Sequence, residues 1–211
     1  MQNHLKDEIR AIISGKGQVR HGAAIQAAAS YLSYGQATSP KSQISKQVQE
    51  QEAKDLEKYI SEKHLWISEI DFSKYVSEGA EQRVFLKDEE SVIKLNDGIY
   101  YSSWRDYFYN LLLHNFFFPD TAYQLLGFTK EEKSLFSVVK QDFVSITEPT
   151  DINQVKLFLE SNGFLNTRNN DYFSPALGII LEDLHDENVL TRNGILYFID
   201  TVFYLTDSFW K

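Results

Sequence analysis

Three polar residues near the carboxy-terminal end of the chain have the types and spacing that phosphate chemistry requires. Asp183 and Asn188 lie in a polar loop after an apolar run, and Asp200 follows a second apolar stretch that turns at Asn193 and Gly194. This pattern predicts strand, loop, strand, tight turn and strand, which brings the three side chains to one end of a small sheet. Phosphoryl transfer uses one carboxylate to orient or deprotonate the attacking hydroxyl, and an amide with a second carboxylate to hold Mg²⁺. The sequence therefore predicts a magnesium-dependent phosphoryl-transfer site.

The run from Asp183 to Asn188 also resembles the catalytic loop of the protein-kinase-like superfamily, which reads Asp-Leu-x-x-x-Asn. The pair Leu184-His185 resembles the same loop in the aminoglycoside and choline phosphotransferases of that superfamily. Asp200 stands twelve residues after Asn188, where the metal-binding aspartate of the family would fall. The resemblance implies that Asp183 is the catalytic base or hydroxyl-orienting group, and that Asn188 and Asp200 bind the metal.

Two segments earlier in the chain resemble the nucleotide-binding strands of the same superfamily. Val92-Ile93-Lys94 is similar to the Val-Ala-Ile-Lys of the third strand, whose lysine contacts the α- and β-phosphates. The glycine-rich loop is kept only in part: Gly79 matches its middle glycine and Val84 its closing valine, while Ser77 and Gln82 replace the outer glycines. The resemblance implies that Lys94, Gly79 and Val84 bind nucleotide.

The whole region from about residue 65 to 205 resembles the small kinase-like domains of polyvalent proteins of bacterial mobile elements. An α+β fold follows from that resemblance, with an antiparallel-sheet N-lobe over 65–140, a hinge over 141–150 and a truncated C-lobe over 151–211. Gln141 and Phe143 open the hinge and are expected to contact the nucleotide. The implied cofactors are ATP and Mg²⁺, and the implied acceptor is a hydroxyl group of a protein or a small molecule.

Residues 1–64 are expected to form a helical extension of different character. Helices are predicted over 7–13 and 23–34, a linker over 35–41, and a polar helix over 42–63 whose apolar stripe is thin. So thin a stripe favours a solvated helix over a packed one.

Departures from the family pattern keep other functions open. No glutamate stands between Glu90 and Glu131 to pair with Lys94, which leaves Asp106 or Glu81 as candidate substitutes. Asp-Thr-Val replaces Asp-Phe-Gly at Asp200, and eleven residues follow it. These features also suit a pseudokinase-like nucleotide-binding or interaction module, and a purely structural α+β domain is a third possibility. His114, with no second ligand in view, is predicted to be a capping or core histidine rather than a metal ligand.

Composition excludes several classes of protein. The chain has 211 residues, 43% of them hydrophobic, which predicts a folded globule. It has no cysteine, so disulfides and thiolate chemistry are absent, as is typical of a reducing compartment. A net charge of -9 argues against a nucleic-acid partner. With no signal peptide or membrane-length apolar run, no membrane partner is expected and a cytoplasmic location is predicted.

Overall fold

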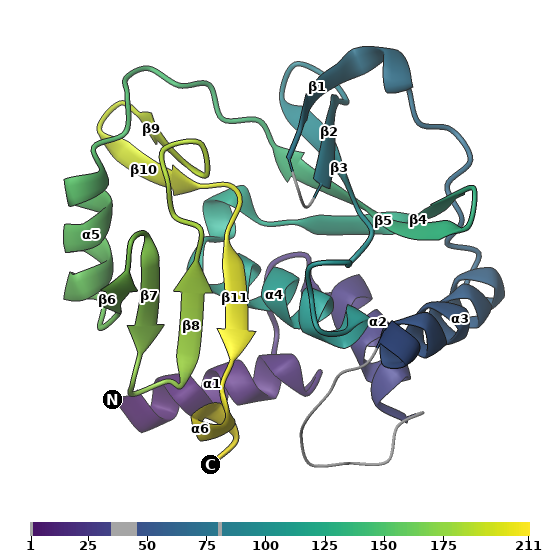
Figure 1. Cartoon of the computed structure of the whole chain (residues 1–211), viewed down its shortest axis with the longest axis horizontal. Helices are drawn as coiled ribbons and strands as arrows, with labels where there is room; N and C mark the ends of the chain where they lie inside the picture. Colours follow the sequence, from purple (N-terminus) through teal and green to yellow (C-terminus); the bar gives the residue numbers. More distant parts are fainter. Residues whose placement is uncertain (1, 35–45, 80–81) are drawn as a thin grey trace.

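The computed structural model describes residues 2–34, 46–79 and 82–211, which form two lobes with a helix between them (Figure 1). The N-lobe is a five-stranded antiparallel sheet with the order β1-β2-β3-β5-β4. Its strands are β1 (Tyr75–Glu78), β2 (Gln82–Leu86), β3 (Ser91–Asn96), β4 (Gln124–Glu131) and β5 (Ser134–Asp142). A short 3₁₀ helix, η1 (Phe72–Lys74), leads into β1, and another, η2 (Pro119–Thr121), precedes β4.

The C-lobe contains a second antiparallel sheet with the order β11-β8-β7-β6, and a separate hairpin of β9 and β10. The fold class is therefore α+β with antiparallel sheets, as predicted. The elements are α5 (Ile152–Ser161), β6 (Leu165–Arg168), β7 (Asp171–Ser174), β8 (Ile179–Glu182), β9 (Val189–Arg192), β10 (Ile195–Phe198), β11 (Val202–Leu205) and α6 (Asp207–Trp210).

Local turn chemistry in the C-lobe follows the sequence closely. Asn193 and Gly194 join β9 to β10 with φ of 52° and 73°, the left-handed pair that a two-residue hairpin requires. Asp151 caps α5 by accepting a hydrogen bond from the backbone N–H of Asn153 at 2.9 Å. Gly163, at φ 82°, ends the same helix. The turn predicted at Asn193 and Gly194 is confirmed.

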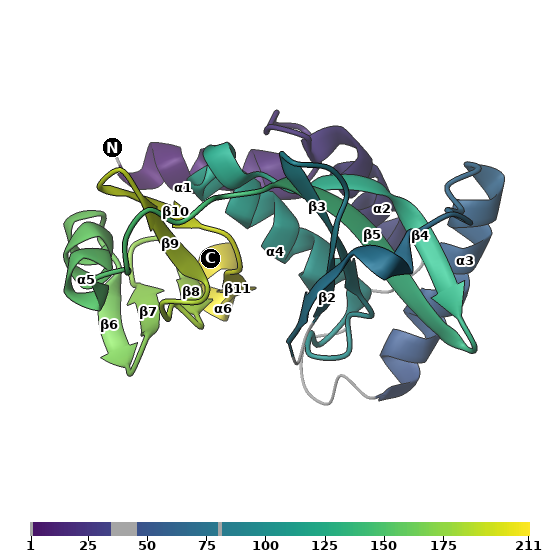
Figure 2. The same cartoon turned by 90° about the horizontal axis from the view of Figure 1, so that it is seen from above.

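Helix α4 (Trp104–Phe117) lies between the two lobes (Figure 2) and has buried residues on every side. It begins at Trp104, because the Ser103 side chain caps it by accepting from the backbone N–H of Asp106 at 3.0 Å. On the C-lobe side, its Asn110 Oδ1 accepts from the backbone N–H of Phe203 in β11 at 2.8 Å. A helix buried on all faces needs partners on all faces.

The remaining faces of α4 are covered by the helices α1 (Gln2–Ile13), α2 (Gly22–Tyr34) and α3 (Lys46–Glu62). The prediction of a solvated polar helix is wrong for α3, because Leu56 and Ile60 are fully buried in one core with Leu112 of α4. A thin stripe suffices here because the partner surface is itself strongly apolar. The predicted linker 35–41 lies outside the described residues, and the domain boundary after residue 64 stays a prediction. None of the helices in the described ranges is long and apolar enough to span a membrane.

Candidate functional site

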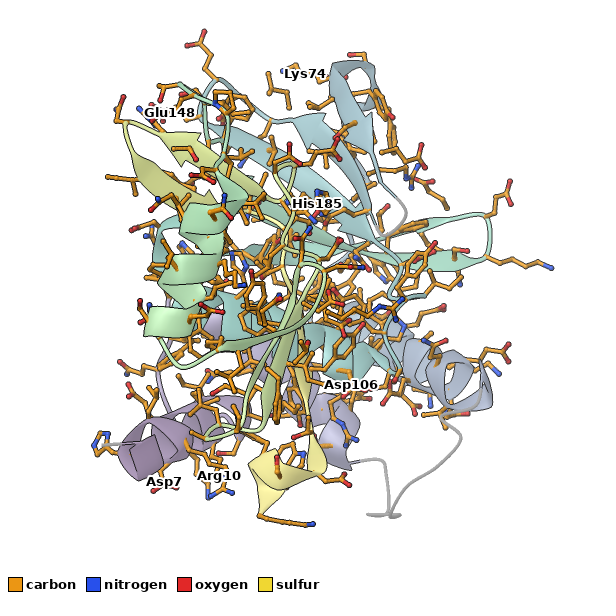
Figure 3. The ribbon with its side chains drawn as sticks, turned by 60° about the vertical axis from the view of Figure 1, so that its left-hand side comes forward. Asp7, Arg10, Lys74, Asp106, Glu148 and His185 are labelled. Carbon is orange, nitrogen blue, oxygen red and sulfur yellow. The ribbon has the colours of Figure 1, made fainter. Side chains whose placement is uncertain are left out.

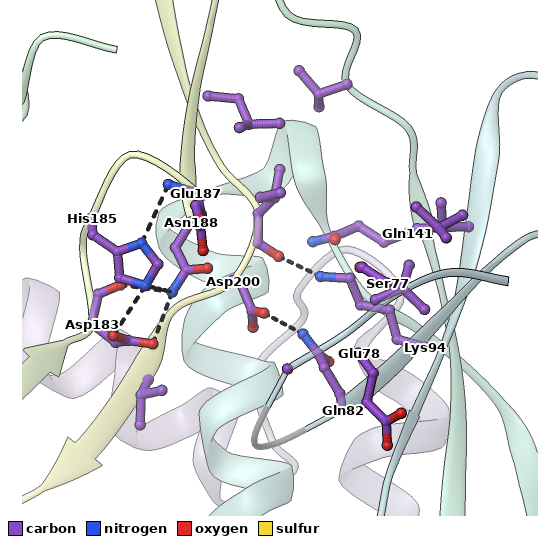
Figure 4. A pocket seen from close by; sticks show the side chains of 18 of the residues that line it. Ser77, Glu78, Gln82, Lys94, Gln141, Asp183, His185, Glu187, Asn188 and Asp200 are labelled. Atoms are coloured by element: carbon purple, nitrogen blue, oxygen red, sulfur yellow. Dashed lines mark hydrogen bonds and ion pairs between the residues drawn. The ribbon is translucent and has the colours of Figure 1, made fainter. Parts of the chain in front are cut away.

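A cavity of about 730 Å³ opens between the two lobes (Figure 4). Strands β1, β2 and β3 line it from the N-lobe, the end of β5 lines its back, and the loop after β8 lines it from the C-lobe. All eight predicted site residues contribute to its lining: Gly79, Val84, Lys94, Gln141, Phe143, Asp183, Asn188 and Asp200. Residues that are up to 121 positions apart (79 to 200) thus face one space.

Asp183 occupies the first position after β8 in a left-handed conformation, with φ of 66°. Its carboxylate is exposed to the cavity and is held from two sides. The Asn188 Nδ2 group donates to Asp183 Oδ2 and to the Asp183 backbone carbonyl, both at 2.8 Å. His185 Nε2 lies 3.3 Å from Asp183 Oδ1. An aspartate in a sparsely populated backbone region, restrained by its neighbours, is typical of functional sites.

The loop that carries Asp183 is a compact turn anchored from below. Leu184 is fully buried, and the backbone N–H groups of Asn188 and Val189 both donate to the carbonyl of His185 at 3.0 Å. The polar side chains on either side of Leu184 are therefore turned to the cavity. The sequence analysis assigned His185 no role beyond the resemblance of Leu184-His185 to one branch of the superfamily. Its spacing of two residues from Asp183 is compatible with the contact between the two side chains.

Asn188 and Asp200 have the donor atoms that a magnesium ion prefers. Asn188 Nδ2 is used on Asp183, and no described residue donates to its Oδ1, while Asp200 Oδ2 accepts from Gln82 Nε2. A backbone hydrogen bond holds the two segments together: the N–H of Ile199, next to Asp200, donates to the Asn188 carbonyl at 2.9 Å. Within the described residues no cluster of three or more His, Asp or Glu side chains could hold a metal alone. One amide and one carboxylate fit instead a magnesium site completed by phosphate oxygens.

Lys94 in β3 is almost fully buried, with 3% of its surface exposed. Its Nζ donates to the backbone carbonyl of Ile199 at 2.9 Å and lies 5.3 Å from the centre of the Tyr123 ring. Burial lowers the pKa of Lys94, and the Asp200 carboxylate opposes that shift. The ammonium is therefore held at a site where a negatively charged ligand would be strongly favoured.

The structure does not place an α4 carboxylate beside Lys94. Asp106 lies well apart from His185 (Figure 3) and does not line the cavity, and the charged group that acts on its pKa is its neighbour Arg105 on the same helix. Burial raises the pKa of Asp106. Asp106 is therefore not a substitute for the helix glutamate. The other candidate, Glu81, lies outside the described residues.

The remaining residues predicted to contact nucleotide differ in whether their side chains are already used in contacts within the protein. A Cβ built on Gly79 would meet no atom within 4 Å, so packing does not require glycine there. Gln141 uses its side chain inside the protein, where Nε2 donates to the Thr121 carbonyl at 2.7 Å. The backbone N–H of Phe143 donates to the Glu90 carbonyl at 2.8 Å, but its side chain is 44% exposed. Phe143 can therefore offer its ring to a ligand, whereas its N–H group is already used.

Side chains from the N-lobe and α4 hold every residue from Phe198 to Thr201. The contacts are Thr121 Oγ1 to the Phe198 carbonyl, Lys94 and Tyr123 to the Ile199 carbonyl, Gln82 to Asp200, and Thr201 Oγ1 to His114 Nδ1 at 2.7 Å. The sequence did not identify Tyr123, Thr121 or the Gln82 contact, because such pairs join distant segments without a shared motif. His114 is a fully buried core histidine, as predicted.

His114 predicts a pH dependence of stability. Burial, supported by the nearby Lys94 charge, lowers the pKa of His114 from 6.5 to about 3. Between pH 6.5 and 3 the His114 imidazole is therefore protonated in the unfolded chain but stays neutral in the folded chain. The free energy of unfolding then falls as the pH falls through this range. This group alone is expected to lower the free energy of unfolding by about 2 kcal/mol between pH 7 and pH 5. Urea unfolding at several pH values measures this decrease in the free energy of unfolding. The decrease between pH 7 and pH 5 should be smaller in His114→Gln than in the original chain, and equal decreases would contradict the assignment.

One family model matches the chain, over residues 49–207, and its description is serine/threonine/tyrosine kinase found in polyvalent proteins. The matched range runs from within α3 to the start of α6 and contains every residue that lines the cavity. No curated protein and no solved structure matches the chain.

Proposed function

We propose, from the premise that the chain belongs to the family of serine/threonine/tyrosine kinases found in polyvalent proteins, that it is an ATP- and Mg²⁺-dependent phosphotransferase. Membership implies a kinase-like phosphotransferase and nucleotide use in general. The finer proposal is transfer of the γ-phosphate to a hydroxyl group of a protein or a small molecule. The observation that carries it is the convergence of Lys94, Asp183, Asn188 and Asp200 on one cavity.

Asp183 is the proposed base. Its carboxylate is exposed to the cavity, and the contacts from Asn188 and His185 restrict its orientation. A carboxylate held this way can accept a hydrogen bond from an incoming hydroxyl and take its proton as the oxygen attacks. His185, beside the same carboxylate, would stabilise its orientation during that transfer.

Asn188 and Asp200 are the proposed ligands of Mg²⁺, through Oδ1 of the amide and the carboxylate. Mg²⁺ bound there would neutralise negative charge on the phosphate that is transferred. Lys94 supplies a buried positive charge for the other phosphates, and its hydrogen bond to Ile199 keeps the amine 2.9 Å from a fixed main-chain oxygen. We propose that the nucleotide is enclosed by Gly79 and Val84 from the partly kept glycine-rich loop, and by Gln141 and the Phe143 ring at the end of β5.

A catalytically weak, pseudokinase-like nucleotide-binding or interaction module is the second candidate. It is favoured by the side-chain amide of Gln82 on Asp200, which competes with a metal, and by the lack of an ion pair on Lys94 within the described residues. The two candidates differ in outcome: a module of this kind would bind nucleotide or a partner without transferring phosphate.

Replacing Asp200 with asparagine tests the nucleotide site. ATP with Mg²⁺ at about 100 times its dissociation constant should stabilise the original chain by about 2.7 kcal/mol. For a chain of this size that corresponds to a rise of roughly 5–10 °C in the thermal midpoint. Asp200→Asn is expected to lose most of this rise, because an amide binds Mg²⁺ much more weakly than a carboxylate does.

The exposed acid Asp120 in η2 provides the matched control, since it does not line the cavity. Asp120→Asn should keep the full rise, and EDTA should remove it from every variant. A rise of equal size in Asp200→Asn would reject Asp200 as a metal ligand. No rise in the original chain would reject the ATP site and leave an interaction module.

A further inference from the structure

The buried ammonium of Lys94 needs a partner that fixes its direction, and no described side-chain carboxylate forms an ion pair with it. Lys94 Nζ donates instead to the Ile199 carbonyl, at 2.9 Å. A carbonyl oxygen has two lone pairs, and the second one here accepts from the Tyr123 hydroxyl at 2.8 Å. The Lys94 Nζ also lies over the face of the Tyr123 ring, 5.3 Å from the ring centre. Tyr123 therefore touches both the lysine and the oxygen that the lysine binds.

Tyr123 is itself held rigidly by α4. Its backbone N–H donates to Asn115 Oδ1 at 2.7 Å, and Asn115 Nδ2 donates to the Tyr123 carbonyl at 2.8 Å. Asn115 is fully buried, and Tyr123 is 3% exposed. This paired contact leaves the tyrosine little freedom, so α4 is connected to Lys94 through neutral groups.

We propose that Tyr123 is the positioning residue of Lys94, in the place where an acidic side chain on the helix was expected. It sets the direction of the Ile199 carbonyl through its hydroxyl group and covers one side of the ammonium with its ring. A neutral partner adds no negative charge beside the ammonium, whereas a carboxylate in the same place would weaken its attraction for a phosphate. This inference rests on the proposed function, since Lys94 must contact phosphate for its direction to matter.

The experiment compares phosphate transfer from ATP in Tyr123→Phe, Tyr123→Leu and the original chain. The first variant keeps the ring and loses the hydroxyl, and the second loses both. Loss of one buried hydrogen bond predicts a kcat about fivefold lower in Tyr123→Phe, and Tyr123→Leu should be lower still. KM for ATP should change less than kcat, because a misdirected amine reduces stabilisation of the transition state more than it reduces ground-state binding of ATP.

The matched control is Tyr107→Phe, which loses a buried tyrosine hydroxyl that contacts Ser137 Oγ at 2.6 Å. Tyr107→Phe should be less stable than the original chain but keep its kcat. A decrease in kcat as large as that of Tyr123→Phe would overturn the proposal. Single-turnover rates in a Lys94→Met background give the second test. If Tyr123 acts through the lysine, Tyr123→Phe should have no further effect there; an undiminished effect would overturn the proposal.

Failure of the proposed function is recognised separately. If the original chain transfers no phosphate, acylation of Lys94 by a small amine-directed reagent, followed by mass spectrometry, still reports on the amine. Faster acylation in Tyr123→Leu than in Tyr107→Phe and the original chain would support the positioning role, and equal rates in all three would overturn it.

Discussion

Replacing Asp183 with asparagine is expected to reduce phosphate transfer by about 10²–10⁴-fold, the usual contribution of a general base. The asparagine side chain has the same shape as aspartate and can still accept one hydrogen bond from Asn188. It cannot take the proton of an attacking hydroxyl. Asparagine also tolerates the left-handed backbone at φ 66°, which alanine would adopt with strain. The thermal midpoint should therefore stay close to that of the original chain.

The matched control for this variant is Asp186→Asn, in the same loop. Asp186 is exposed and does not line the cavity, so its replacement should leave both transfer and stability unchanged. Steady-state transfer of labelled phosphate from ATP measures the effect, with thermal unfolding in parallel. Full activity in a folded Asp183→Asn protein would exclude Asp183 as the base, and retained nucleotide binding without transfer in the original chain would favour the pseudokinase-like module.

Replacing Lys94 with methionine is expected to stabilise the nucleotide-free protein and to weaken nucleotide binding and phosphate transfer strongly, leaving a residual rate that single-turnover kinetics can follow. The ammonium is buried, and its lowered pKa means that the folded state disfavours the charge. A methionine side chain of similar length removes that cost, and the Ile199 carbonyl still accepts from Tyr123. Replacement of a buried charge by an apolar residue suggests a gain of roughly 1 kcal/mol or more, or about 2–4 °C in the thermal midpoint.

The size of this gain in stability depends on pH in a way that can be checked. Because the folded pKa of Lys94 lies below 10.5, the unfolded state holds more protons between the two values, and the original chain becomes more stable as the pH rises through that window. The advantage of Lys94→Met should therefore shrink towards pH 10.5. Thermal unfolding across pH measures it, with the exposed Lys133→Met in the β4–β5 turn as control. A less stable Lys94→Met protein that keeps its ATP-dependent rise would contradict both expectations.

The sequence alone determined the local parts of the site. The strand, turn and strand around Asp183 and Asn188 and the hairpin at Asn193 are encoded by neighbouring residues, because turn type depends on the backbone preferences of two or three positions. The apolar strand around Lys94 is local in the same sense. Such short-range patterns, together with the resemblance of their motifs to the kinase-like superfamily, identified residues that all line one cavity.

Only the tertiary structure decided which distant groups meet. The partner of Lys94 is a main-chain carbonyl 105 positions later, and a carbonyl leaves no mark in a sequence because every residue has one. The face of α4 that Asp106 occupies and the burial of α3 were likewise set by packing, since a helix with apolar residues all round does not indicate which neighbour covers which side. Periodicity identifies the elements, whereas the contacts between them depend on shape complementarity across the whole core.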